Sequence, residues 1–310
     1  MNTDASHLGR LACLAGRSWR VADLPGGLTN HNVRVTTTDG PDAGEPLDLV
    51  VRCTQSDAGL LGIDRDAEHA NTTAAGAAGV GAEVVEYRPD LGMLVIGYLG
   101  GRTLADPDLG DPAVLARAAD AVRRLHAGAP FVGRFDMFAR QATYRATVRE
   151  RGFALPPTYD DHAAAWDDVR RALAVGAGPL VPCNNDLLAA NFIDDGDRVW
   201  LIDYEYSGDN DASFELGNTA TECGFTDDQT DAWVEAYLRP VGGPTRADLA
   251  RVRLQMLCSE YGWSLWGFIQ AATSPLDHDF DAWGRERLDK AEATFRSPAL
   301  ARLLQEATGA

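Results

Sequence analysis

Residues 182–218, PCNNDLLAANFIDDGDRVWLIDYEYSGDNDASFELGN, hold the groups that decide the fold of this chain. Asp186 is followed five residues later by Asn191, and Asp203 ends a short apolar run at 199–202. In phosphoryl transfer, one carboxylate orients and deprotonates the attacking hydroxyl, while an amide oxygen and a second carboxylate hold Mg²⁺ on the nucleotide phosphates. The spacing of these three side chains therefore predicts a phosphoryl-transfer site.

Aspartate and asparagine also occur in turns for local reasons, so the alternative interpretation is an acidic loop before an ordinary strand and turn. Three features favour the phosphoryl-transfer hypothesis. The run VWLI at 199–202 is typical of a buried strand that would place Asp203 at its end, and DDGD at 194–197 predicts a hairpin turn between the two aspartates. A third acid, Glu205, follows on the same side of the chain.

The composition indicates a globular protein with more than one unit. A chain of 310 residues suits two domains or lobes, and 45% hydrophobic with 24% charged residues is an ordinary soluble composition. The net charge of -18 argues against nucleic acid and anionic membrane surfaces as partners. It suits a cationic substrate, or an anionic one bound together with Mg²⁺, although solubility alone is an alternative reason for it.

The cysteines and the N-terminus indicate a reducing compartment. The five cysteines are scattered without the spacing of a zinc site, so we expect them to be buried thiols. The N-terminus lacks the apolar segment of a signal peptide, and no apolar run approaches the ~20 residues that cross a bilayer. We therefore expect a cytoplasmic protein, and its oligomeric state stays open.

Two segments near the N-terminus predict contacts with nucleotide phosphates. The glycine pair in PGGLTNHN at 25–32 lets the backbone lie close to phosphates, with Thr29 and Asn30 as donors, and the alternative is a plain hairpin turn. The run LDLVVR predicts a strand ending in Arg52, and Glu68 falls on the alanine-rich helix that follows. Such a cation and acid form the ion pair that aligns nucleotide phosphates in kinases, whereas a solvent-facing pair would contribute little.

The periodicity changes from strand-like to helical between an expected N-terminal lobe at 1–99 and a C-terminal lobe at 100–310, which predicts an α+β protein. The first long helix begins with an N-cap at Asp111 and a proline at the next position. It ends at His126, where a cation is favoured, and we expect a structural role for this histidine. Thr226 opens a later helix with a capping box.

Residues 254–270 predict a helix whose two faces have different partners. An apolar stripe follows the helical period, and Trp263 and Trp266 fall on the opposite face. Two tryptophans away from the main stripe need a second partner. That partner is either another helix or a cation, because indole faces bind quaternary ammonium by cation–π attraction.

In this order and spacing the segments resemble a choline/ethanolamine kinase of the bacterial type, over roughly residues 22–295. The resemblance implies a protein-kinase-like fold, shared with aminoglycoside phosphotransferases. It has an N-terminal antiparallel sheet with one helix and a larger, mainly helical C-terminal lobe. The matching segments are PGGLTNHNVRV, LVVRC, LGIDRDAEHANTTAA, CNNDLLAANFI, LIDYEYSGDNDASFELGN and YGWSLWGFIQ.

The resemblance also implies a role for each matching residue. Asp186 would orient and activate the substrate hydroxyl as the catalytic base. The residues implied as Mg²⁺ ligands are Asn191 and Asp203. The residues implied at the nucleotide are Thr29, Asn30, Arg52 and Glu68. The residues implied at the substrate are Glu205, Glu222, Trp263 and Trp266.

The implied activity is transfer of the ATP γ-phosphoryl group to the hydroxyl of choline or ethanolamine, a small cationic alcohol. One residue departs from the family pattern, because Asn184 stands where the catalytic loop begins with histidine. Asparagine can replace some hydrogen bonds of that ring, so activity is expected. The alternatives are a kinase for another cationic alcohol, such as an aminoglycoside or other antibiotic, and a non-catalytic nucleotide- or choline-binding protein.

Overall fold

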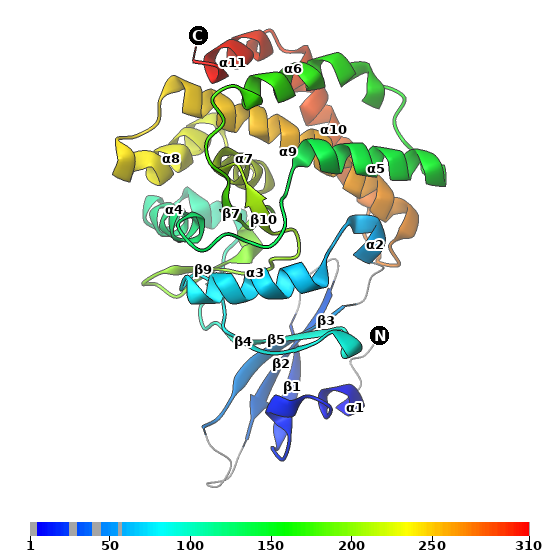
Figure 1. Cartoon of the computed structure of the whole chain (residues 1–310), viewed down its shortest axis with the longest axis vertical. Helices are drawn as coiled ribbons and strands as arrows, with labels where there is room; N and C mark the ends of the chain where they lie inside the picture. The colour runs from blue at the N-terminus through cyan, green and yellow to red at the C-terminus, as the bar shows by residue number, and fades with distance from the viewer. Residues whose placement is uncertain (1–4, 25–29, 39–44, 55–57, 310) are drawn as a thin grey trace.

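The computed structural model describes residues 5–24, 30–38, 45–54 and 58–309. An antiparallel sheet and a larger helical region form two lobes (Figure 1). The sheet has five strands in the order β1-β2-β3-β5-β4. Their bounds are β1 (Trp19–Leu24), β2 (Asn30–Thr37), β3 (Asp48–Thr54), β4 (Val84–Arg88) and β5 (Met93–Gly97).

The two faces of the sheet have different partners. Before the sheet come a short helix, α1 (Ala5–Leu8), and a 3-10 turn at Ala12–Leu14, and the leucines of this segment pack with Val51 in the core of the lobe. Because successive side chains of a strand alternate between faces, Val50 and Arg52 point the other way, and both line the cleft toward the helical lobe. Strand alternation therefore delivers the Arg52 cation to the cleft.

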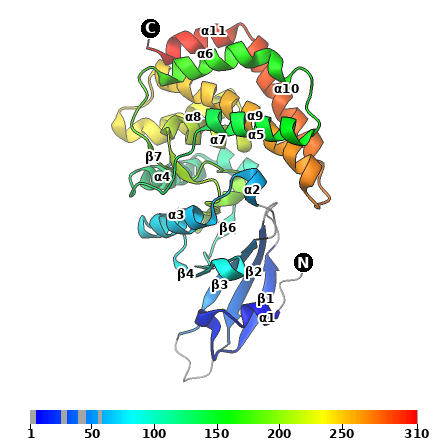
Figure 2. The ribbon, with the colours of Figure 1, turned by 45° about the vertical axis from the view of Figure 1, so that its right-hand side comes forward.

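Between β3 and β4 lie the short α2 (Ala58–Leu61) and the long α3 (Arg65–Ala77). The α3 helix begins at Asp64, whose carboxylate accepts the first free N–H groups of the helix. In both views it lies between the sheet and the helical lobe (Figure 1, Figure 2). Asn71 binds it to the helical lobe, with Nδ2 donating to the Val132 carbonyl at 3.1 Å and to Ser207 Oγ at 3.0 Å.

The C-terminal lobe is mainly helical. Its helices are α4 (Pro112–His126), α5 (Met137–Arg151), α6 (Ala163–Ala174), α7 (Ala212–Glu222), α8 (Asp227–Leu238), α9 (Arg246–Thr273), α10 (Phe280–Arg296) and α11 (Ala299–Ala307). Its short strands are β6 (Arg102–Thr103), β7 (Val181–Cys183), β8 (Phe192–Asp194), β9 (Val199–Leu201) and β10 (Gly208–Asn210). The antiparallel pair of β8 and β9 is the hairpin expected at 194–197.

The central helix of this lobe is α9, which packs against α5, α7, α10 and α11. Both of its faces are buried, so the predicted face that carries Trp263 and Trp266 has a helix as a partner as well as the cleft. Two glycines set the crossing with α10. A Cβ on Gly267 would lie 2.8 Å from the Cα of Gly284, a separation that real Cβ atoms do not show. The two backbones therefore touch, and only glycine fits there.

Several local predictions are confirmed and some are wrong. The N-cap at Asp111 and the capping box at Thr226 are present. His126 lies in the core with its Nδ1 2.7 Å from the Tyr237 hydroxyl, which agrees with the structural role expected for it, and burial lowers its pKa to about 3. The five cysteines form no disulfide, but Cys13 and Cys53 are only half-buried, so the expectation that all of them are buried is wrong for these two. Within the ranges given above, no helix is long and apolar enough to span a membrane.

Candidate active site

A cleft of about 450 Å³ lies between the two lobes. The sheet contributes apolar side chains and a cation, the segment after β7 contributes acids, and α9 and α10 contribute tryptophans. The residues of the cleft used below are Arg52, Asp186, Asn191, Asp203, Glu205, Tyr206, Glu222, Trp263, Trp266 and Trp283. The cleft thus brings together the predicted catalytic, metal and substrate residues, whereas Thr29 lies outside the described residues.

A buried carboxylate holds the loop that carries Asp186. Glu215 on α7 accepts the backbone N–H groups of Asn184 and Asn185 at 2.9 and 2.6 Å. Burial raises the pKa of Glu215 to about 7. Asn185 adopts a left-handed backbone with φ of 66°, a strained conformation that persists where the surroundings fix it. These two hydrogen bonds therefore fix the turn that presents Asp186 to the cleft.

Asn184 connects this loop to the segment of Asp203. Its Nδ2 donates to the carbonyls of Ile202 at 3.1 Å and Asp203 at 2.9 Å, and its Oδ1 accepts the N–H of Asp186 at 3.1 Å. The side chain is fully buried. At the position where the resemblance expects histidine, asparagine thus makes hydrogen bonds to both acidic segments.

Asp186 stands half-buried among other acids. Burial raises its pKa well above the usual range, and Glu222, Asp203 and Glu205 raise it further because like charges disfavour ionisation. The Arg287 cation acts in the opposite direction. A general base becomes stronger as its pKa rises toward the operating pH, so the direction of this shift favours proton acceptance by the ionised carboxylate.

Asn191 and Asp203 line the cleft together with Asp186. Asn191 donates its Nδ2 to the Asp186 carbonyl at 2.8 Å, which fixes the amide and leaves its oxygen as an acceptor. Asp203 has a left-handed backbone with φ of 63°, and its buried Oδ1 accepts no hydrogen bond. The described residues contain no cluster of three or more His, Cys, Asp or Glu arranged to hold a metal. This donor set fits Mg²⁺, which usually combines one or two carboxylates with phosphate oxygens.

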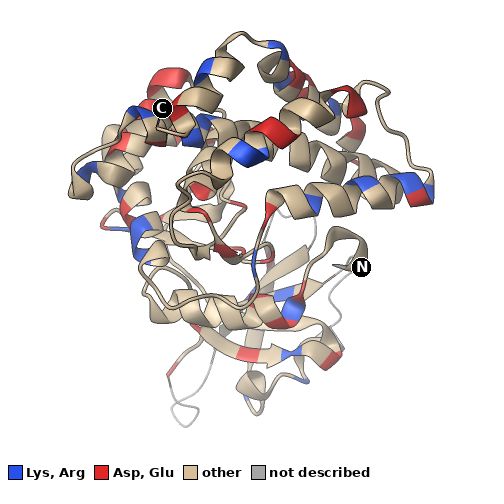
Figure 3. Ribbon diagram, turned by 45° about the horizontal axis from the view of Figure 1, so that its top comes forward, with Lys and Arg blue, Asp and Glu red and all other residues tan. Residues whose placement is uncertain are grey.

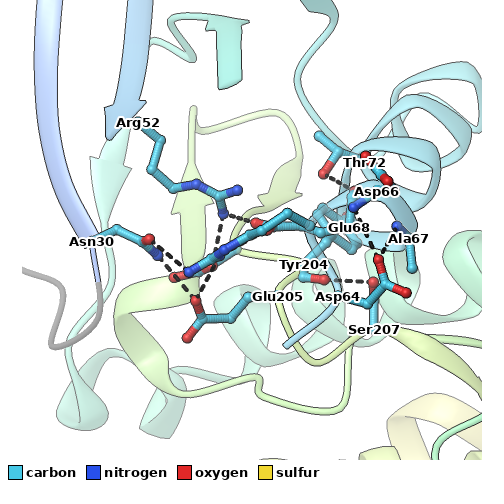
Figure 4. A network of polar contacts seen from close by, with 12 residues as sticks. Asn30, Arg52, Asp64, Asp66, Ala67, Glu68, Thr72, Tyr204, Glu205 and Ser207 are labelled. Atoms are coloured by element: carbon cyan, nitrogen blue, oxygen red, sulfur yellow. Dashed lines mark hydrogen bonds and ion pairs between the residues drawn. The ribbon is translucent and has the colours of Figure 1, made fainter. Parts of the chain in front are cut away.

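A network of ion pairs joins the sheet, α3 and the segment after Asp203 (Figure 4). Arg52 contacts Glu68, and its Nη1 lies 3.7 Å from Asp203 Oδ1. Glu68 is 1% exposed, so the alternative of a solvent-facing pair is wrong. Arg65 extends the network to Glu205, because its Nη1 lies 2.8 Å from Glu68 Oε2 and 3.3 Å from Glu205 Oε2. The network holds the two lobes in one arrangement around the cleft.

Asn30 enters the same network from the first residue of β2. Its Nδ2 donates to Glu205 Oε2 at 3.0 Å, and its Oδ1 accepts from Arg65 Nη2 at 3.1 Å. Glu205, predicted at the substrate, thus lines the cleft while bonded to the N-terminal lobe.

The far end of the cleft is aromatic. Trp263 donates its indole N–H to Asn218 Oδ1 at 2.9 Å, and Trp266 donates to the Tyr206 hydroxyl at 2.9 Å. The Trp283 ring, from α10, lies 5.2 Å from that of Trp266. Because the indole N–H groups of Trp263 and Trp266 are bonded to buried partners, these two rings can offer a ligand in the cleft only their apolar surfaces, which suit an apolar or cationic group.

Asn218 couples this aromatic end to the catalytic loop. Its Oδ1 accepts from Trp263 and, at 2.8 Å, from Ser259 Oγ, while its Nδ2 donates to the Asn185 carbonyl at 3.3 Å. The residue is fully buried. One amide therefore fixes both a pocket tryptophan and the residue before Asp186.

The sequence profile described as choline/ethanolamine kinase matches residues 21–292. The chain belongs to the choline/ethanolamine kinase family. Family members are ATP-dependent phosphotransferases that act on an alcohol, which confirms the activity predicted from the sequence.

Individual relatives agree with this assignment. Protein LicA of Haemophilus influenzae is 24% identical over 278 residues, 86% of this chain and 77% of that protein. A probable ethanolamine kinase of Arabidopsis thaliana is 24% identical over 288 residues, 84% of this chain and 75% of that protein. The crystal structure of a choline/ethanolamine kinase family protein from Mesorhizobium loti has a TM-score of 0.83 at 32% identity, and the match covers 100% of both chains. The predicted fold is thereby confirmed.

Several residues of this family member's site were not predicted from its sequence. Arg65 and Glu215 look like ordinary charged residues of helices until the fold places Arg65 against Glu68 and Glu205 and Glu215 against the loop of Asp186. Asn218, Trp283 and Arg287 belong to helices whose relative placement no local pattern gives. The glycines Gly267 and Gly284 offered a signal, since a glycine within a helix often marks a close approach.

Proposed function

We propose that this chain transfers the γ-phosphoryl group of Mg-ATP to the hydroxyl of choline. The observation that supports this most is the adjacency of an aromatic pocket to Asp186 within one cleft. A trimethylammonium group is bound by indole faces, and a hydroxyl two carbons away would reach toward the acid. Asp186 would orient that hydroxyl and accept its proton.

Binding of the nucleotide would use the sheet side of the cleft. Arg52, aligned by Glu68, would contact the phosphates, with Asn30 beside them at the start of β2. Thr29 stays predicted as a further phosphate contact. The adenine would occupy the apolar part of the cleft between the lobes, whose lining residues include Val50, Ala82, Leu94, Ile96 and Leu188.

Asn191 and Asp203 would hold Mg²⁺ on the phosphates. The ion supplies positive charge to the phosphate oxygens as the phosphoryl group moves between acceptors. The unpartnered Asp203 Oδ1 supports this assignment, because a buried carboxylate oxygen without a hydrogen bond is unfavourable unless a ligand completes it. Arg52, whose Nη1 lies 3.7 Å from Asp203 Oδ1, would help to neutralise the negative charge of the same phosphates.

The decisive experiment is ADP release with Mg-ATP across choline, ethanolamine, an aminoglycoside and no acceptor. Turnover with choline well above that with the others is expected, because a primary amine uses carboxylates more than indole faces. Turnover only with the aminoglycoside would support phosphotransferase activity but contradict choline as the acceptor. Binding of ATP without turnover of any acceptor would favour the alternative of a non-catalytic binding protein.

We also propose a cytoplasmic location, supported by the use of ATP and by cysteines that form no disulfide among the described residues. Acidic and basic residues are interspersed along the helices (Figure 3). Fractionation of cells that produce the protein tests this. Recovery with a membrane or extracellular fraction would contradict it.

A further inference from the structure

Arg287 on α10 already occupies two of the groups that a substrate cation would use. Its guanidinium contacts the Glu222 carboxylate, and its Cζ lies 3.5 Å from the centroid of the Trp283 ring. Glu222 and Trp283 both line the cleft. The side chains of Arg287 and Glu222 are each 10% exposed. A resident cation thus stands at the aromatic end of the cleft.

Among the described charged groups around this pair, Arg287 is the one that neutralises the Glu222 carboxylate. Glu260 on α9 is half-buried, and burial raises its pKa to about 7, while Lys290 and Arg287 lower it and Glu222 raises it. Lys290 pairs with Glu286 at 2.8 Å on the exposed side of α10. Among the residues that the structure describes, Arg287 is the cation in contact with Glu222.

Primary and quaternary ammonium groups make different demands on such a pocket. A primary ammonium has three N–H donors and loses its hydration on burial, so it needs acceptors, above all a free carboxylate. A trimethylammonium group has no N–H donor and is held by aromatic faces. A carboxylate that is already paired with a guanidinium is a poor acceptor for a second cation, because the two cations repel each other in a buried site.

We propose that Arg287 is a specificity-determining residue that makes this pocket select a quaternary over a primary ammonium group. It does so by keeping the Glu222 carboxylate occupied, so that Trp263 and Trp266 decide which cation binds. This inference rests on the proposed function for its substrate, but it concerns the pocket and can be measured without phosphoryl transfer.

The test compares Arg287→Gln with Arg285→Gln. Arg285 lies on the same helix, is 52% exposed and pairs with Asp281 at 2.6 Å, so its variant controls for loss of a helix arginine. Steady-state ADP release gives kcat/KM for choline and for ethanolamine. Intrinsic tryptophan fluorescence gives the affinities for tetramethylammonium and methylammonium, two head groups without a hydroxyl.

Arg287→Gln is expected to lower the choline-to-ethanolamine ratio of kcat/KM by about tenfold, mainly through a lower KM for ethanolamine, because it frees a buried carboxylate. The affinity for methylammonium relative to tetramethylammonium is expected to rise in parallel. Arg285→Gln is expected to change neither this affinity ratio nor the choline-to-ethanolamine ratio of kcat/KM. The double variant Arg287→Met/Glu222→Gln removes both charges and returns the ratio toward that of the wild type. If Arg287→Gln does not fold, Arg287→Lys keeps the charge, loosens the pair and shifts the ratio in the same direction.

Three outcomes would overturn the inference: an unchanged ratio in a folded Arg287→Gln or Arg287→Lys, an equally lowered ratio in the double variant, or no binding of either head group to the wild type. A failure of the proposed function has a different pattern. The wild type would then turn over neither amino alcohol, while the fluorescence titrations still showed the shift between tetramethylammonium and methylammonium on substitution of Arg287, which would support the inference.

Discussion

Replacing Asn184 by alanine is expected to lower both stability and turnover, because this buried amide joins the loop of Asp186 to the segment of Asp203. The side chain makes its hydrogen bonds to Ile202, Asp203 and Asp186 at 3.1, 2.9 and 3.1 Å. A net contribution of about 1 kcal/mol for each bond gives about 3 kcal/mol in the free energy of unfolding. Asn184 is 0% exposed, so water does not replace the lost partners.

Urea denaturation followed by tryptophan fluorescence measures the stability, and ADP release at saturating ATP and acceptor measures kcat. Asn184→Asp is the matched variant. It keeps the size of the side chain and the bond from the Asp186 N–H, but it sets a carboxylate against two carbonyl oxygens. We therefore expect it to be at least as destabilising as alanine.

An unfolding free energy of Asn184→Ala within about 0.5 kcal/mol of the wild type would refute the hydrogen-bond argument. A loss of stability with an unchanged kcat would keep the structural part and reject the claim that this amide positions Asp186 against Asp203. A fall in kcat with an unchanged free energy of unfolding would keep the claim that this amide positions Asp186 against Asp203 and reject the claim that it stabilises the fold.

Four further predictions concern catalysis and pH. Asp186→Asn should lower kcat by about a hundredfold to ten-thousandfold with the ATP affinity kept, and near wild-type turnover would mean that another group is the base. Trp263→Ala should raise the KM for choline far more than the KM for ATP in initial-rate assays, whereas equal changes would indicate a folding defect. Chelation with EDTA should abolish ADP release, and added Mg²⁺ should restore it if Asn191 and Asp203 bind this ion; turnover that survives chelation would contradict the metal assignment. Because the pKa of Glu215 is raised from 4.5 to about 7 on folding, its contribution to the free energy of unfolding is fully present below pH 4.5 and declines as pH rises through about 7. Urea titrations of Glu215→Gln should show a flatter pH dependence in that window, and a slope equal to that of the wild type would contradict the burial argument.

The parts of the fold that depend on local chemistry could be predicted from the sequence. Caps such as Asp111 and Thr226 act on the backbone a few residues away, so their position alone fixes a helix start. The spacing of Asp186, Asn191 and Asp203 was informative because the loop and hairpin between them are short. The structural role expected for His126 agrees with its buried position, where burial lowers its pKa and outweighs the favourable charge at a helix end.

The parts of the site that depend on packing between distant helices could not be predicted from the residues themselves. Arg287 on α10 meets Glu222 at the end of α7 because both helices pack against α9, and the periodicity of each helix does not predict how they pack. The network of Arg65 likewise depends on how α3 lies against the C-terminal lobe. Resemblance to a family placed Glu222 at the substrate, but it did not reveal that a guanidinium already pairs with it.

The glycine contact between α9 and α10 sets how two tryptophans of the cleft lie relative to each other. Trp266 and Trp283 each lie next to a contacting glycine in the chain, so the 5.2 Å separation of their ring centroids follows the distance between two backbones. A methyl group at Gly284 would meet the Ser264 carbonyl at 3.0 Å and force the helices apart. The shape of the aromatic end of the cleft therefore depends on Gly267 and Gly284, two residues outside the cleft lining. A search for variants that accept bulkier alcohols should start at these glycines, since changes to the aromatic rings would also remove the groups that bind the cation.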